Sequence, residues 1–255
     1  MGEKSALYLS FKSFRNSLRR WIPGVFVLGK GLSLFYSKRS ILRESGYFKS
    51  VALKRPCRLD GSPIPWMNYG AINFLEERLG SDLDIFEYGS VNSTIFFAGL
   101  VNSVTSLECD HGWYEYVKGI LPSNASVLFC PIGDSAYVGS IAEQDKKFDV
   151  VIVDAEERVI CMLNGADFLT DRGVILLDDA ARPVYREGVD GLLAKGFRVL
   201  PFDGMKAGGI NIYRTSIFYR DNNCLGIWPG LSCDSAIAGK DLYDTRLQII
   251  GTSED

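Results

Sequence analysis

Histidine is almost absent from this sequence, because His111 is the only one in the chain. A zinc site built on a histidine pair and a charge-relay triad of the usual kind are therefore nearly excluded. The six cysteines form no C-x-x-C pair, and several stand within apolar runs where a buried thiol simply packs. We therefore expect no disulfide framework and a reducing compartment, the cytoplasm.

Long hydrophobic runs are also lacking. The apolar stretch from Trp21 to Tyr36 is interrupted by Pro23, three glycines and Lys30. It is shorter than the ~20 residues that a membrane-spanning helix needs, and no small-residue cleavage site follows it. We expect neither a transmembrane helix nor a signal peptide.

Acidic residues are scarce at the start of the chain. Residues 1–58 hold 13 Lys/Arg against 2 Asp/Glu, a net charge of +11, whereas the remainder holds 15 against 29, a net charge of −14. Apolar residues recur among these cations at helical spacing, at Leu7, Phe11, Phe14, Leu18 and Trp21. Such a segment suits an anionic membrane or a protein partner, and a solvated basic helix packed on the main domain explains it equally well. We expect a basic helical extension over 1–60, with residues 1–58 as the contact region. If the contact is with a membrane, the protein is expected to be peripheral to its inner face.

From residue 61 onward, short apolar strands alternate with amphipathic helices. The pattern predicts strands at 84–88, 104–108, 126–130, 148–155 and 173–180, and helices at 66–80, 93–101, 113–121, 135–144, 156–169 and 184–195. Two further strands, 197–204 and 210–221, are joined by the short turn MKAGG and should pair antiparallel. The sequence therefore predicts an α/β fold with a doubly wound, mostly parallel sheet over 61–222, followed by a tail, 223–255.

The glycine-rich loop of dinucleotide-binding proteins is missing as well. The first strand leads into Gly89, but Val91 and Ser93 stand where G-x-G-x-x-G would need glycine. A diphosphate could not rest on this turn as it does in those proteins, so an NAD-dependent oxidoreductase is a poor interpretation. Glu87, two residues before Gly89, would instead suit a ligand with a cationic end.

Acidic residues follow the next two strands. Glu108 ends the second strand, 21 residues after Glu87, where a carboxylate can accept hydrogen bonds from both ribose hydroxyls. Asp134, after the third strand, could accept from an adenine amino group. Together with the hydroxyl and amide side chains of Ser90, Asn92 and Ser93, these features indicate S-adenosylmethionine (SAM) as the cofactor.

Between Gly61 and Arg220 the sequence resembles class I SAM-dependent methyltransferases, through FEYGSVNST, SLECDHGWYEYV, PIGDSA, FDVVIVDAEER and GVILLDDA. The stretch DGSPIPWMNYGAINFLEERL resembles the entry helix of methyltransferases that modify polysaccharides or sugars. The resemblance implies a seven-stranded, Rossmann-like sheet ending in an antiparallel hairpin, with SAM as cofactor. It departs from the family at Val91, where a glycine is common. The cofactor residues implied are Glu87, Gly89, Ser90, Asn92, Ser93, Glu108, Cys109, Asp134 and Ser135.

Three carboxylates follow the fourth and fifth strands: Asp154, Asp178 and Asp179. As a cluster they could hold Mg²⁺, which prefers carboxylate oxygens and would orient an acceptor hydroxyl. Some O-methyltransferases that act on catechols and sugars have a similar arrangement. Alternatively, Asp154 is a lone catalytic base and the other two acids cap a helix. Four nearby side chains could line an acceptor pocket or lie on solvated helix faces: Arg158, Arg182, Tyr185 and Arg186.

The sequence thus predicts a SAM-dependent methyltransferase that methylates a hydroxyl of a sugar or another polyhydroxylated small molecule or glycan, with no nucleic acid partner. His111 is expected to be an adenosine-side contact or a surface residue rather than a base. The alternative is a catalytically degenerate protein of the same fold that serves as a membrane-associated interaction module.

Overall fold

The computed structural model describes residues 14, 22–133 and 135–227. Most of the predicted basic helix between Leu7 and Trp21 lies outside the described residues. Of it only Phe14 is described, as a helical and exposed residue. The predicted C-terminal tail is described as far as Ile227, which is buried together with Leu225.

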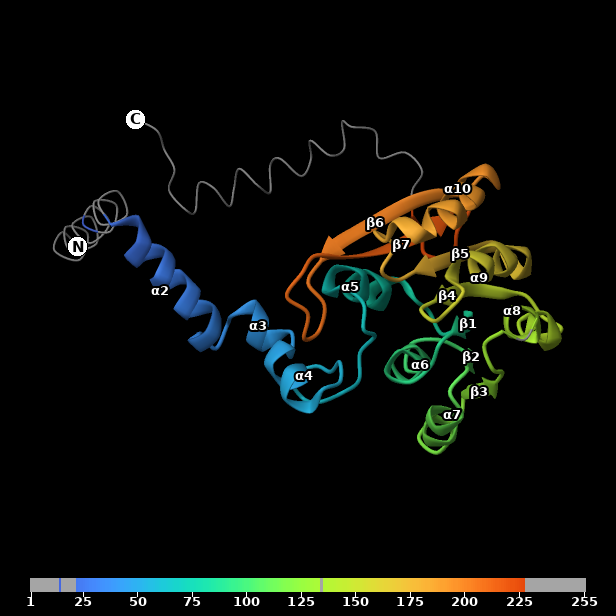
Figure 1. The fold of residues 1–255 in the computed structure, drawn as a ribbon, viewed down its shortest axis with the longest axis horizontal. Coiled ribbons are helices and arrows are strands. Elements are labelled where there is room, and N and C mark those ends of the chain that lie inside the picture. Colours follow the sequence, from blue (N-terminus) through green and yellow to red (C-terminus); the bar gives the residue numbers. More distant parts are fainter. Residues whose placement is uncertain (1–13, 15–21, 134, 228–255) are drawn as a thin grey trace.

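A seven-stranded sheet forms the centre of the molecule, in the order β3-β2-β1-β4-β5-β7-β6 (Figure 1). Five strands run parallel, whereas β7 is antiparallel to both of its neighbours. This topology confirms the predicted doubly wound sheet and its closing hairpin. The strands are β1 Asp84–Tyr88, β2 Ser103–Glu108, β3 Ala125–Phe129, β4 Phe148–Val153, β5 Leu169–Leu177, β6 Arg198–Gly204 and β7 Tyr213–Tyr219.

Helices connect and cover the strands. They are α2 Pro23–Tyr36, α3 Ile41–Glu44, α4 Tyr47–Leu53, α5 Tyr69–Arg78, α6 Asn92–Ala98, α7 His111–Lys118, α8 Ser135–Gly139, α9 Arg158–Gly165 and α10 Arg186–Ala194, with the short 3₁₀ turns Ala142–Gln144, Ala166–Phe168 and Pro183–Tyr185. The first two 3₁₀ turns fall inside ranges that the sequence predicted as continuous helices, and the third overlaps the start of the predicted helix 184–195. Among the described residues, no helix combines the length and apolarity needed to cross a bilayer.

Both faces of the sheet are apolar, because successive side chains of a strand point to opposite faces. On β1, Ile85 packs with α5 and α6, whereas Phe86 packs with α8, α9 and α10 on the other face. The central strand β4 alternates in the same way over Val150–Val153, all fully buried. This two-sided burial explains why the strands appear in the sequence as continuous apolar runs.

The predicted helix 66–80 begins later than expected. Asn68 caps α5 by accepting a hydrogen bond from the Ala71 amide at 2.9 Å, so the helix starts at Tyr69. Trp66 therefore precedes the helix, and its indole is half exposed. Trp66 stands three residues before Tyr69, which is a helical spacing, and the pattern therefore placed it in the helix. Its neighbours Ile64 and Met67 are buried against the sheet.

The N-terminal helices differ in how they meet the body. In α4, the buried Ser50 hydroxyl donates to the Cys57 carbonyl at 3.0 Å, and the chain that follows is buried at Pro56 and Cys57. By contrast, α2 has no buried residue and extends away from the sheet (Figure 1). Within the described residues, the extension is thus docked at its C-terminal end, whereas α2 is largely exposed.

Candidate functional site

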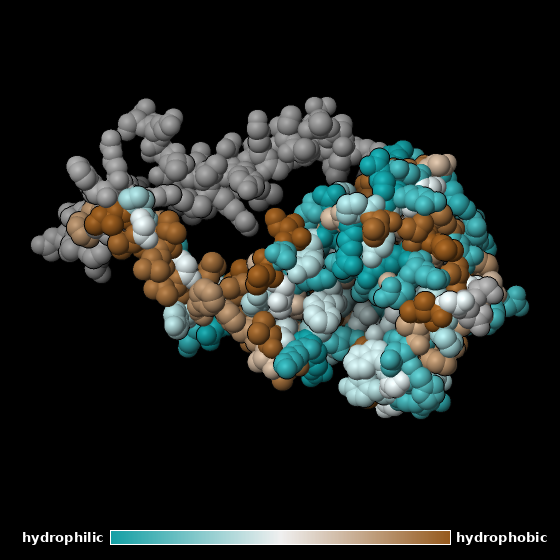
Figure 2. Space-filling model, in the orientation of Figure 1, coloured by the Kyte–Doolittle hydropathy of each residue, from teal (hydrophilic) through white to brown (hydrophobic). Residues whose placement is uncertain are grey.

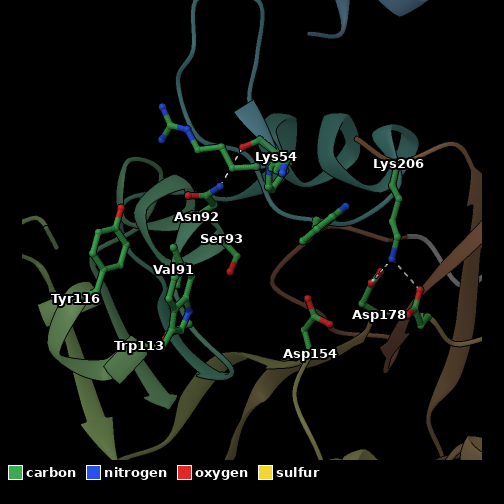
Figure 3. Close-up of a pocket in the computed structure, with 14 residues that line it drawn as sticks. Lys54, Val91, Asn92, Ser93, Trp113, Tyr116, Asp154, Asp178 and Lys206 are labelled. Atoms are coloured by element: carbon green, nitrogen blue, oxygen red, sulfur yellow. Dashed lines mark hydrogen bonds and ion pairs between the residues drawn. The ribbon is translucent and has the colours of Figure 1, made fainter. Parts of the chain in front are cut away.

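A cavity of about 420 Å³ opens at the carboxyl ends of the parallel strands, on both sides of the point where the strand order reverses between β1 and β4. Ligands of doubly wound proteins bind at this point. Figure 3 shows Val91, Asn92 and Ser93 on one side and Asp154, Asp178 and Lys206 on the other. The lining consists of Lys54, Arg55, Pro56, Trp66, Ser90, Val91, Asn92, Ser93, Trp113, Tyr116, Asp154, Asp178, Asp179 and Lys206.

The turn after β1 brings its backbone against the end of β4. Gly89 has φ +106°, and its amide donates to the Leu107 carbonyl at 2.9 Å. A Cβ at this position would lie 2.8 Å from the Asp154 carbonyl oxygen. Both the backbone conformation and the close approach therefore require glycine here.

Val91 also has a backbone conformation that favours glycine, with φ 126° and ψ −105°. A β-branched residue at positive φ is a true outlier. Its amide donates to Thr94 Oγ1 at 3.1 Å, and this hydroxyl in turn donates to Glu87 Oε2 at 2.6 Å. Because Thr94 and Glu87 are buried, this chain of hydrogen bonds holds Val91 in place, with its side chain in the cavity wall.

Glu87 lies beneath the turn rather than in the cavity wall, with 1% of its surface exposed. Burial raises the pKa of this carboxyl to about 7, against the opposing effect of hydrogen bonds from Ser93 and Thr94. A cation bound in the cavity nearby would favour its ionised form.

Glu108, at the end of β2, also lies outside the cavity lining and is nearly buried. Its Oε1 accepts from the amides of Cys109 and Asp110, at 2.8 and 3.0 Å. Its Oε2 accepts from the Ser90 hydroxyl at 2.7 Å. The carboxylate thus connects the β1 and β2 turns, and Ser90 takes the position at which a ligand hydroxyl could donate.

Asp154 lies on the floor of the cavity, with about a quarter of its side chain exposed. Arg158 pairs with it at 2.9 Å and also donates to the Asp178 carbonyl at 2.6 Å. The close packing around the carboxyl and the neighbouring Asp178 raise the pKa of Asp154, which the Arg158 charge only partly offsets.

Asp178 and Asp179 both face Lys206, which lies in the turn between β6 and β7 (Figure 3). The Lys206 ammonium lies 3.0 Å from Asp179 Oδ1 and 3.7 Å from Asp178 Oδ2. Asp178 also accepts from Thr215 at 2.6 Å, and burial raises its pKa. Asp179 also pairs with Arg182; although burial acts to raise the pKa of Asp179, Lys206 and the neighbouring cations bring it below its usual value.

This arrangement does not fit the Mg²⁺ site that the sequence predicted at Asp154, Asp178 and Asp179. Arg158 and Lys206 occupy the positions beside these carboxylates where a metal ion would bind. Within the described part of the chain, no group of three His, Cys, Asp or Glu side chains could hold a metal ion. The sequence did not indicate the pairing of Lys206 with Asp178 and Asp179, because Lys206 lies in the turn of the closing hairpin, far along the chain.

Other cavity residues also escaped the sequence analysis. Trp66 donates from Nε1 to the Ala207 carbonyl at 2.9 Å, which fixes its half-exposed ring in the wall. The Pro56 carbonyl accepts from Asn92 Nδ2 at 3.0 Å, so the turn after α4 is attached to α6 beside the cavity. The only local signals in the sequence were the tryptophan itself and a lysine in a glycine-rich turn.

Trp113 and Tyr116 of α7 stack on each other, with ring centroids 5.2 Å apart, and both line the cavity while about half exposed. His111 lies on the exposed start of the same helix, with its ring edge against Phe129. Asp134 lies outside the described residues, and Ser135 begins α8. Cys109 is half-buried beside Glu108, and burial raises the pKa of its thiol. Arg186 pairs with Asp190 on an exposed helix face.

The comparisons with known proteins give structural similarity only. No protein-family model and no curated protein matches the sequence. Similar solved structures include an O-methyltransferase from Bacillus cereus in complex with SAH, with 14% identity over 76% of this chain and 97% of that chain, TM-score 0.49. A second is precorrin-6y C5,15-methyltransferase from Geobacter metallireducens, with 15% identity over 59% of this chain and 86% of that chain, TM-score 0.48. A third is a methyltransferase-like protein from Silicibacter pomeroyi, with 22% identity over 62% of this chain and 90% of that chain, TM-score 0.44.

The sheet topology of this chain itself defines its fold class. Five parallel strands on either side of one reversal point, closed by an antiparallel hairpin, make up the Rossmann-like fold of class I methyltransferases.

Proposed function

We propose that this protein is a SAM-dependent methyltransferase that transfers a methyl group to a hydroxyl oxygen of a sugar or another polyhydroxylated acceptor. One observation carries the proposal: the cavity lies at the strand-order reversal, behind a turn that has buried acids beneath it and no cradle for a diphosphate. SAM has no diphosphate and has a cationic methionine end. The acceptor class rests on the sequence resemblance described above.

The cofactor would lie between the β1 turn and α7. The exposed rings of Trp113 and Tyr116 offer flat apolar surfaces beside Val91 for the adenine (Figure 3). Glu108 would exchange the Ser90 hydroxyl for a ribose hydroxyl. Ser93 and Asn92 would contact the methionine part from above the buried Glu87. Gly89, Cys109, Asp134 and Ser135 complete the proposed binding set.

Bound SAM would supply an electrophilic methyl group on a sulfonium. The chain itself has to orient the acceptor oxygen in line with that methyl group, and positioning of this kind contributes roughly 7 to 11 kcal/mol. Asp154 is proposed to accept the proton of the acceptor hydroxyl as its oxygen forms the new bond to carbon. Its raised pKa suits this role, because a general base works best when its pKa is near the working pH.

The acceptor end of the cavity lies toward the N-terminal extension. The half-exposed Trp66 ring offers a face on which the C–H groups of a sugar ring could pack. Lys54 and Arg55 line the same cavity, and neither forms an ion pair with another described residue. Their uncompensated charge favours an acceptor that carries a phosphate or carboxylate beside its hydroxyls.

Calorimetric titration with SAM, SAH and NAD tests the proposal. We expect heat of binding with both sulfur nucleosides and none with NAD. The same heats are expected after treatment with EDTA, because Arg158 and Lys206, rather than a metal ion, pair with Asp154, Asp178 and Asp179. Binding of NAD alone, or of none of the three, would refute the proposal.

A pair of variants locates the cofactor. Trp113→Ala should weaken SAH binding roughly tenfold, because stacking of a base on an aromatic ring is worth ~1–3 kcal/mol. Tyr114→Ala is the matched control, since Tyr114 lies on the same helix but outside the cavity lining. Equal affinity of the two variants would place the nucleoside elsewhere.

A second candidate function is favoured by Val91, whose side chain narrows the cavity at a position with glycine-like backbone. It is a catalytically degenerate protein that serves as an interaction module through its N-terminal segment. An absence of heat with SAM and SAH, together with retained partner binding, would support this candidate. In both cases we propose a cytoplasmic protein whose residues 1–58 contact a membrane or a partner protein.

A further inference from the structure

The other described residues leave most of the surface of helix α2 exposed. None of its 14 residues is buried, and Val27, Leu28 and Tyr36 are 68%, 63% and 77% exposed. Figure 2 shows a continuous apolar surface along this arm. Soluble monomers rarely leave such a contiguous apolar patch uncovered, so it marks a site of interaction.

The apolar surface extends around most of the helix. At 100° per residue, the exposed apolar side chains fall within an arc of roughly 200°. They are Val25, Val27, Leu28, Leu32, Leu34, Phe35 and Tyr36. A helix that packs on a protein core needs an apolar stripe of only about 100°. A protein groove would leave part of this arc in water, whereas lipid chains surround a helix and would cover all of it.

The length and the charges of the segment indicate one leaflet. A helix of 14 residues is about 21 Å long, less than the ~30 Å hydrocarbon core of a bilayer. The remaining arc of roughly 160° carries Lys30 and Ser33 together with the partly buried Phe26, and the exposed cations Lys38 and Arg39 follow the helix directly. Lys30, Lys38 and Arg39 form no ion pair with another described residue. Residues 1–58 have a net charge of +11.

We propose that α2 inserts lengthwise into one leaflet of an anionic bilayer, with its apolar arc among the acyl chains and Lys30, Lys38 and Arg39 at the lipid phosphates. This inference is independent of methyl transfer, because α2 contributes no residue to the cavity. It commits the N-terminal contact to lipid rather than to a protein partner.

Vesicle flotation of the full chain tests the proposal, with vesicles of phosphatidylcholine alone or mixed with phosphatidylglycerol. We expect strong binding to the anionic vesicles only, together with slowed hydrogen exchange of the α2 amides. The triple variant Val27→Glu/Leu28→Glu/Phe35→Glu should lose about a hundredfold or more in affinity. The variant Lys30→Gln/Lys38→Gln/Arg39→Gln should lose about fivefold per cation.

The matched control is Ile160→Glu/Val184→Glu/Leu193→Glu, which adds the same charge at exposed apolar positions of the body. It should bind vesicles like the unmodified chain. SAH binding of the α2 variant should be unchanged, and its thermal stability should fall only slightly, since α2 buries no residue and the loss is limited to the contact of Phe35 with Phe48.

Three results would overturn the proposal. One is absence of vesicle binding by the full chain. Another is equal binding by the α2 variant and the control. The third is self-association in solution that the α2 variant abolishes without any vesicle binding, which would make the arc an interface between copies of the chain. None of these results depends on cofactor binding, so the methyltransferase proposal stands or fails separately.

Discussion

Val91 occupies a backbone conformation that L-amino acids rarely adopt, and the buried pair Thr94 and Glu87 holds it there. Strained residues of this kind cost of order 1–3 kcal/mol and gather at functional sites. Here the strain lies in the turn that borders the cavity. The departure from a glycine-rich turn, visible in the sequence, thus corresponds to a physical strain in the structure.

Replacing Val91 by glycine and by alanine measures this strain. Both variants lose the valine side chain, but only glycine relaxes at φ 126°. We expect Val91→Gly to be more stable than Val91→Ala by about 1 kcal/mol in urea denaturation. At the exposed helical position Glu115 the order should reverse, with Glu115→Ala more stable than Glu115→Gly by about 1 kcal/mol. The same order at both positions would contradict the strain.

Glu87 should make stability depend on pH. Its pKa is about 7 in the folded chain and 4.5 in the unfolded chain, so over this window only the unfolded chain has released the proton. The unfolded state is therefore favoured progressively as pH rises through the window, and the effect levels off above pH 7.

The expected loss is about 3 kcal/mol in the free energy of unfolding between the two pKa values. Glu87→Gln should remove this component, so the difference between the two proteins changes with pH. Denaturant titrations at several pH values measure it. Parallel pH profiles for both proteins would show that Glu87 does not titrate in this range.

Among the elements, the start of α5 positions the β6–β7 turn. Asn68 caps the helix and donates from Nδ2 to the Phe202 carbonyl at 2.8 Å, while the Tyr69 amide donates to the Met205 carbonyl at 3.0 Å. Trp66 adds its bond to Ala207. These contacts hold Lys206 beside Asp178 and Asp179, so the beginning of a helix determines the charge balance of the cavity.

Asn68→Ala should therefore destabilise the protein more than removal of an ordinary cap. We expect a loss of about 2 to 4 kcal/mol, because the cap and the bond to the partly buried Phe202 carbonyl are both lost. Asp110→Ala is the comparison, since Asp110 caps α7 at an exposed position and should cost about 1 kcal/mol. Urea denaturation of both variants tests the difference, and equal losses would mean that the contact with β6 is unimportant.

At the scale of the whole molecule, the N-terminal extension serves two purposes. Its last part, from Lys54 to Pro56, builds a wall of the cavity, whereas α2 buries no residue and its Phe35 packs on Phe48 of α4. The predicted boundary between extension and methyltransferase domain near residue 60 remains a prediction.

Two truncations test this boundary. A chain that begins at Ser37 should unfold within about 1 kcal/mol of the full chain, because α2 buries no residue and its contact of Phe35 with Phe48 is a single aromatic pair. A chain that begins at Leu59 should lose about 2 kcal/mol or more, since it lacks the buried Pro56 and Cys57 and the bond from Asn92. Thermal denaturation compares them, and equal stability of the two would place the boundary near residue 60.

Most of the fold followed from local patterns. Runs such as FDVVIVDA and GVILLDDA predicted buried parallel strands, and the short MKAGG turn predicted the antiparallel hairpin. Helix ends were less predictable, as at Trp66, because its spacing to Tyr69 is helical although the helix begins only after the Asn68 cap.

The sequence by itself determined the sheet, its connections and the positions of Glu87, Glu108 and Asp154 at strand ends, because alternation and turn residues act over a few neighbours. Only the tertiary structure decided what these carboxylates contact. Lys206 reaches Asp178 and Asp179, and Ser90 reaches Glu108, across gaps that no local pattern encodes. Charge pairing depends on distances of a few ångströms between elements far apart in the chain, and these distances exist only once the sheet and hairpin have packed together.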